Sequence, residues 1–210
     1  MKFLPEVVTF RITSRCNNNC KCCFGPPKNL KELNFLKLKK VFKFLHTSGT
    51  KAIVLTGGEP LLRKDFKNII QELKKYNFKI YLDTSGYSFF KYRDLILKNI
   101  DVLGLPIYFP SYNYKNAADL KTIIKILSFL KGRKDKPVIR IGTVITKENI
   151  NYLKRIGNLI KKYPIDIWKL YEFTPQNINA VKNKSVLEIT AKQFDAATKK
   201  IKMSFSRFFR

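Results

Sequence analysis

The chain alternates between short runs of aliphatic and β-branched residues and longer runs with helical spacing, and this alternation limits the folds open to it. The predicted strands cover residues 7–13, 52–56, 79–83, 101–105, 138–144 and 166–172. The predicted helices cover residues 34–45, 66–76, 93–98, 117–131 and 149–162. Strands that alternate with helices indicate a parallel sheet with the helices outside it. The six units predict an α/β fold, a partial (βα)6 TIM-type barrel that stays open as a three-quarter barrel.

The chain is long enough for one domain and little else. Residues 1–174 are predicted to form the barrel. Residues 175–210 form a C-terminal extension, with a polar stretch at Gln176–Ser185 and a last helix from Ala191 to about Met203. The final residues, 204–210, resemble an incomplete strand or helix. One hypothesis is therefore that the extension is truncated and lacks a segment that caps the substrate.

All four cysteines fall within eight residues near the start of the chain. Cys16, Cys20 and Cys23 have the spacing C-x3-C-x2-C, and three thiolates can hold an iron–sulfur cluster while leaving one iron without a protein ligand. Structural zinc needs a fourth ligand, for which Cys22 is available, and disulfides need an oxidising compartment, which no signal peptide indicates. The sole histidine, His46, ends an apolar helical stretch and is expected to pack. An iron–sulfur cluster is favoured, and structural zinc and disulfides remain as alternatives.

A second motif, Gly57-Gly58-Glu59-Pro60, follows the buried strand at residues 52–56. The glycines are expected to let the backbone turn its N–H groups outward and admit a ligand closely. Taken alone, the motif is a weak turn signal. In barrel enzymes the loops at the carboxyl ends of the strands carry the site, and both motifs fall at such ends.

Taken together, these motifs resemble the radical S-adenosylmethionine (radical SAM) superfamily. The resemblance runs from about Val7 to Thr174. It rests on the cysteine spacing and on the segments 13–16, 55–66, 82–86 and 141–149. Two unrelated motifs stand at the expected strand ends in the expected order.

The resemblance implies a 4Fe-4S cluster and S-adenosyl-L-methionine as cofactors. Cys16, Cys20 and Cys23 would ligate three irons, and the amino and carboxylate groups of S-adenosylmethionine would chelate the fourth. Reductive cleavage of S-adenosylmethionine would then give a 5′-deoxyadenosyl radical that abstracts hydrogen from an unknown substrate. The barrel would orient the cofactor and exclude water.

The same resemblance assigns residues along S-adenosylmethionine. Gly57, Gly58 and Glu59 would line its methionine end, with their backbone and carboxylate meeting the ammonium group. Thr84 and Ser85, with Asp83 close by, would stand against its ribose.

At the end of the fifth strand, Gly142, Thr143 and Val144 would pass the adenine. The superfamily usually has an aromatic residue just before the third cysteine, where this chain has Cys22. Cys22 is expected to be a small buried bystander, with an alternate ligand or an oxidation-prone site as the other reading. Phe24, one position beyond the loop, would take over part of the adenine contact.

Aromatic residues mostly recur at helix or strand spacing and are expected in the core. Tyr108, Tyr112 and Tyr114 are different, because they follow the strand at 101–105 without helical periodicity. Loop packing is favoured for them over contact with the substrate.

The net charge of +27 raises the question of nucleic acid. The basic residues are spread along the chain, and only Lys131–Lys136 forms a compact run, in a loop opposite the motifs. A solvated surface is therefore favoured, while transfer RNA remains a possible substrate. A positive rim also suits an acidic electron donor such as flavodoxin or ferredoxin.

The segments 168–175 and 143–149 are most similar to the branch of viperin-like enzymes and molybdenum-cofactor synthase A. No apolar run reaches the ~20 residues of a membrane span, and a cytoplasmic location is expected. The alternative function is a cluster-containing or RNA-binding accessory protein without turnover.

Overall fold

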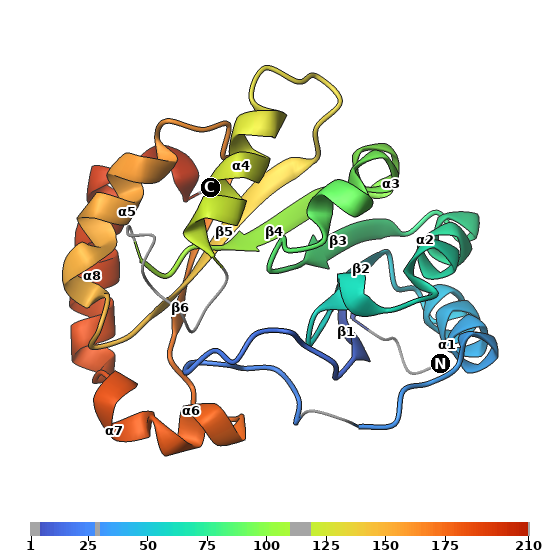
Figure 1. Ribbon diagram of the computed structural model, residues 1–210, viewed down its shortest axis with the longest axis horizontal. Coiled ribbons are helices and arrows are strands. Elements are labelled where there is room, and N and C mark those ends of the chain that lie inside the picture. Colours follow the sequence, from blue (N-terminus) through green and yellow to red (C-terminus); the bar gives the residue numbers. More distant parts are fainter. Residues whose placement is uncertain (1–4, 28–29, 110–118, 210) are drawn as a thin grey trace.

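The sheet has six parallel strands in the order β1-β2-β3-β4-β5-β6, so each strand pairs with its neighbours in sequence (Figure 1). The computed structural model describes residues 5–27, 30–109 and 119–209. The strands are β1 (Val7–Thr13), β2 (Ala52–Gly57), β3 (Lys79–Asp83), β4 (Val102–Pro106), β5 (Val138–Ile145) and β6 (Ile167–Glu172). The first and last strands of this order do not pair, and the predicted open (βα)6 barrel is confirmed.

Helices follow the strands along the chain and cover the outer side of the sheet (Figure 1). The α-helices are α1 (Phe35–Thr47), α2 (Phe66–Lys75), α3 (Arg93–Asn99), α4 (Leu120–Leu130), α5 (Leu153–Ile160), α6 (Ile178–Lys182), α7 (Lys184–Leu187) and α8 (Ala191–Ser204). Short 3-10 turns are η1 (Pro60–Leu62), η2 (Phe89–Lys91), η3 (Ile150–Tyr152) and η4 (Ser206–Phe208).

The apolar core lies between the sheet and these helices. Helix α2 buries Phe66, Ile69, Ile70 and Leu73 completely, at the three- and four-residue spacing of one helix face. Each such side chain contributes about 1.5–3 kcal/mol by leaving water. His46 packs its ring against aromatic side chains that follow α2, as expected.

The other face of the sheet carries both polar and apolar side chains. Along β5, Ile139 and Ile141 are fully buried in the core, whereas Arg140, Gly142 and Val144 line a cavity on the inner side. This alternation follows from the two-residue period of a strand. The inner face of the open barrel is therefore available for a ligand.

Two stretches differ from the sequence-based expectation. The polar segment Gln176–Ser185 contains α6 and the start of α7, and both helices are too short to show helical periodicity. The helix expected from residue 149 starts as the 3-10 turn η3, because Asn149 turns its side chain back to accept from Thr146 N (2.8 Å) and to donate to Val144 O (2.8 Å).

The C-terminal residues join the same core as the barrel. Phe205 and Phe208 are buried, and the Phe205 ring stands edge-on to that of Trp168, with centroids 5.8 Å apart. Among the helices of the described residues, none has both the length and the apolar character that crossing a bilayer would require.

Candidate functional site

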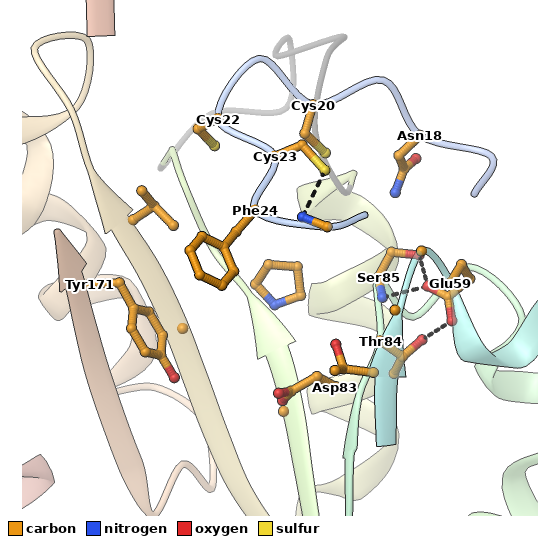
Figure 2. Close-up of a pocket in the computed structure, with 18 of the residues that line it drawn as sticks. Asn18, Cys20, Cys22, Cys23, Phe24, Glu59, Asp83, Thr84, Ser85 and Tyr171 are labelled. Atoms are coloured by element: carbon orange, nitrogen blue, oxygen red, sulfur yellow. Dashed lines mark hydrogen bonds between the residues drawn. The ribbon is translucent and has the colours of Figure 1, made fainter. Parts of the chain in front are cut away.

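A cavity of about 640 Å³ opens at the carboxyl ends of the strands, next to the loop that carries the cysteines (Figure 2). Every strand of the sheet contributes to its lining. The predicted site residues in this lining are Cys16, Cys20, Cys23, Gly57, Gly58, Glu59, Thr84, Ser85, Gly142 and Val144. The topology therefore brings the separate motifs to one place.

The cysteine loop, residues 16–27, forms one wall of the cavity. The backbone N–H of Asn18 donates to Cys16 Sγ (3.4 Å), and that of Gly25 donates to Cys23 Sγ (3.3 Å). Burial, with the neighbouring thiols as a further cause, raises the pKa of Cys20 to about 12. Thiols in such surroundings stay protonated unless a cation holds the thiolate form.

These residues fit a multi-iron cluster better than a single ion. Within the described ranges, no three Cys, His, Asp or Glu side chains are arranged to hold one metal ion. A tetrahedral zinc site requires its ligands around one point. In a cluster the cysteine thiolates ligate separate irons, so their sulfur atoms need only face the same cavity.

The glycine pair allows β2 to end directly against β1 and the cysteine loop. Gly57 has a φ of +141°, and a Cβ there would stand 2.2 Å from Thr13 O. A Cβ on Gly58 would stand 2.2 Å from Arg15 O. The N–H of Gly58 donates to Thr13 O (2.8 Å), and that of Glu59 donates to Arg15 O (2.7 Å). The expectation of outward-facing amides is wrong for these two groups, because neighbouring backbone already binds them.

The carboxylate of Glu59 links the loop after β2 to the loop after β3 (Figure 2). Its Oε1 accepts from Thr84 Oγ1 (2.6 Å) and Leu61 N (3.1 Å). Its Oε2 accepts from Ser85 N (2.7 Å) and Ser85 Oγ (2.5 Å). Glu59 is only 1% exposed, and these four bonds match the acceptor capacity of a carboxylate. The side chain therefore braces two predicted parts of the site.

The three residues predicted at the end of β5 separate into two groups. Gly142 and Val144 line the cavity. Thr143 is fully buried on the other face, where it donates to Ile107 O (2.7 Å) and accepts from Trp168 Nε1 (3.0 Å). Its side chain is thus held in the core and does not reach the cavity.

The floor of the cavity contains Asp83 together with two residues that the sequence did not single out, Arg140 and Tyr171. Arg140 Nη2 donates to Asp83 Oδ1, and Gly104 makes room for this pair, since a Cβ there would stand 1.9 Å from Asp83 Oδ1. Tyr171 lies beside Gly142, and burial raises the pKa of its phenol. The sequence feature that could have indicated Arg140 is a single charged residue on the inward-facing side of an otherwise apolar strand.

Cys22 lines the cavity and also packs against a small apolar cluster. The buried members of this cluster are Phe173, Ala180 and Leu187. Burial raises the pKa of the Cys22 thiol to about 12. These contacts favour the reading of Cys22 as a packing residue.

Two aromatic residues that the sequence singled out, Phe24 and Tyr108, line the cavity. Phe24 is 51% exposed and borders the cavity, with the Arg11 guanidinium 5.4 Å from its ring centroid. Tyr108 lines the cavity too, and burial raises the pKa of its phenol. Tyr112 and Tyr114 lie outside the described residues.

The comparison with known families decides how these motifs are read together. The sequence model described as the Radical SAM superfamily matches residues 10–160. The chain belongs to the radical SAM superfamily. Members of this superfamily are enzymes that use a 4Fe-4S cluster and S-adenosylmethionine, and both cofactors predicted from the sequence are those of the family.

Relatives within the superfamily include named enzymes. GTP 3′,8-cyclase of Haemophilus ducreyi is 33% identical over 129 residues, covering 58% of this chain and 37% of the relative. An S-adenosylmethionine-dependent nucleotide dehydratase of Selenomonas ruminantium is 30% identical over 179 residues, covering 78% of this chain and 64% of the relative. The first is molybdenum-cofactor synthase A, so the predicted branch is confirmed. The chain thus spans one third to two thirds of these relatives.

A solved structure shows the same fold. The crystal structure of Streptococcus suis SuiB bound to its precursor peptide SuiA aligns with a TM-score of 0.78 at 14% sequence identity. The alignment covers 97% of this chain and 47% of SuiB. The radical SAM core of this chain therefore has the partial-barrel architecture.

Proposed function

We propose that the chain is a radical SAM enzyme that cleaves S-adenosylmethionine reductively and abstracts hydrogen from a substrate. The observation that carries this proposal is the meeting of the C-x3-C-x2-C loop and the GGEP turn in one cavity of about 640 Å³. When bound, the cluster and S-adenosylmethionine supply the 5′-deoxyadenosyl radical. The protein supplies binding, orientation and shelter from water.

In this proposal Cys16, Cys20 and Cys23 hold three irons. The fourth iron is left to the amino and carboxylate groups of S-adenosylmethionine. The environment of Cys20 supports this assignment, because burial raises the pKa of its thiol and the thiolate form there needs a compensating cation.

The loops after β2 and β3 take the rest of the cofactor. Gly57, Gly58 and Glu59 form the methionine end, and Thr84 with Ser85 forms the ribose end. Because the Glu59 carboxylate binds both hydroxyls, the two ends keep a fixed spacing. A wall fixed in this way keeps its shape when a ligand binds against it.

The adenine is proposed to pass Gly142 and Val144, and the substrate to lie over the floor formed by Asp83, Arg140 and Tyr171. The two relatives described above are named for reactions of GTP and of a nucleotide. Their names support a nucleotide as the first substrate class to test here. We further propose an acidic electron donor such as flavodoxin or ferredoxin, supported by the net charge of +27.

The test is anaerobic reconstitution with iron and sulfide, followed by dithionite and S-adenosylmethionine. We expect 5′-deoxyadenosine, measured by chromatography, in the wild-type protein. A reconstituted cluster that never yields 5′-deoxyadenosine would refute the enzyme and favour the accessory protein without turnover.

Two matched cysteine variants test the ligand assignment. Cys20→Ala is expected to lose most cluster iron, and Cys22→Ala is expected to retain it, since Cys22 packs against apolar side chains. Iron per chain is measured after reconstitution. Equal iron loss in both variants would show that the three ligands are assigned wrongly.

A further inference from the structure

Asn177 connects the C-terminal extension to the cysteine loop. It is buried, and its Nδ2 donates to Gly25 O (3.0 Å) and Pro26 O (3.1 Å), the second and third residues after Cys23. Its Oδ1 accepts from Asn179 N (3.0 Å). The two amide protons and the oxygen thus have separate partners, which fixes the orientation of the amide.

Two further contacts reach earlier parts of the same loop. Asn179 Nδ2 donates to Asn19 Oδ1 (2.6 Å). Cys22 packs against the apolar cluster that includes Ala180 and Leu187, both nearly fully buried. Residues 177–187 therefore contact the loop before Cys20, between Cys20 and Cys23, and after Cys23.

The α6–α7 segment is itself fixed to the barrel. Lys147, in the loop after β5, donates through Nζ to Ser185 O (2.8 Å) and through its backbone N–H to Leu187 O (2.9 Å). Figure 1 shows the cysteine loop extending from the end of β1 to α6, across the open side of the barrel. Residues 177–187 thus connect the cysteine loop after β1 with the loop after β5.

We propose that residues 177–187, called the clip, hold the cysteine loop in the conformation that accepts the cluster, and that Asn177 is the positioning residue. This inference rests on the proposed function. Asn177 acts through Gly25 and Pro26 and touches no proposed cofactor ligand. Removing its donors leaves two carbonyl groups without their partners in a loop that lacks regular structure.

The main variant is Asn177→Asp, which keeps an oxygen to cap α6 but replaces both donated protons with an acceptor. Loss of two hydrogen bonds corresponds to about a tenfold or larger rise in the opening of the loop. We expect amide hydrogen exchange of residues 19–26 in the iron-free chain to accelerate by that factor. The exchange of β2 and β3 and the unfolding midpoint are expected to stay close to wild type.

In the reconstituted protein, the same variant is expected to release iron to a chelator about tenfold faster. The electron paramagnetic resonance spectrum of the reduced cluster is expected to broaden, because the cysteines sample more than one arrangement. Asn183→Ala is the matched control, since its side chain donates only to Asn179 O within the clip (2.8 Å).

Asn179→Ala provides a second, milder variant, because it removes the side-chain contact with Asn19 alone. Its loop exchange is expected to rise about two- to fivefold. Unchanged loop exchange in Asn177→Asp and Asn179→Ala, or an equal change in Asn183→Ala, would overturn the clip. If wild-type protein takes up no cluster, the proposed function fails, whereas exchange in the iron-free chain still decides the clip.

Discussion

The two sides of the cavity are built on different principles. On the side of β2 and β3, buried polar groups bind one another completely, with Glu59 at the centre. On the floor, Asp83 and Arg140 form a single pair, and the Asp83 side chain is 39% exposed. The first side has a fixed geometry and the second keeps unused hydrogen-bonding capacity. This difference suits a constant cofactor on one side and a substrate particular to this protein on the other.

The largest loss of stability is expected when Glu59, the central group of the first side, is removed. Glu59→Ala leaves the donors of Leu61, Thr84 and Ser85 without an acceptor, and we expect about 3 kcal/mol or more of stability to be lost. Urea unfolding of the iron-free chain measures the loss. Glu188→Gln serves as the control, because Glu188 is exposed and pairs only with Lys184 on α7. A loss below about 1 kcal/mol for Glu59→Ala would contradict the view that the side at β2 and β3 is more rigid than the floor.

The same substitution, glycine to alanine, probes the two sides directly. A Cβ on Gly58 would meet the backbone oxygen of Arg15, whereas a Cβ on Gly104 would meet the carboxylate of Asp83. Backbone yields less readily than the end of a side chain, so we expect Gly58→Ala to cost about 3 kcal/mol and Gly104→Ala about 1 kcal/mol. Thermal and urea unfolding check both values. The reverse order would show that the floor is the more rigid side.

The glycines also show what a sequence does and does not reveal. Strand and helix periodicity predicted the barrel, and a motif at each strand end predicted residues that line one cavity, because both are encoded by residues close in sequence. The pairing of Asp83 with Arg140 joins two strands that are not neighbours, and it depends on the missing side chain of Gly104 between them. The position of Thr143 on the core face required the exact register of β5.

The clip illustrates the same limit. Helices α6 and α7 are too short for a periodic pattern, and their role appears only through contacts with the cysteine loop more than a hundred residues earlier. No local signal in a polar segment indicates such a partner.

Thiol reactivity tests whether the cysteine loop closes the cofactor side to water. Burial raises the pKa values of Cys20 and Cys22 to about 12, so in the iron-free chain both are expected to react with iodoacetamide at pH 8 at least about tenfold more slowly than after unfolding. Folding favours the protonated thiols, so stability is complete below the ordinary pKa of 9.0 and falls as the pH rises toward about 12. Mass spectrometry of alkylated peptides gives the rates. Equal rates in folded and unfolded chains would place these thiols in open solvent.

The smallest effect on stability is expected on the floor. Arg140→Met keeps the apolar stem and removes the guanidinium, leaving an Asp83 carboxylate that already reaches the cavity. Because that partner is partly exposed, we expect a loss of about 1 kcal/mol or less in urea unfolding and unchanged iron per chain after reconstitution. Arg133→Met is the matched control, since Arg133 pairs with Asp135 in the exposed loop before β5. If Arg140→Met destabilised the chain as strongly as Glu59→Ala, the pair on the floor would be a structural brace, and the substrate would have to be sought elsewhere in the cavity.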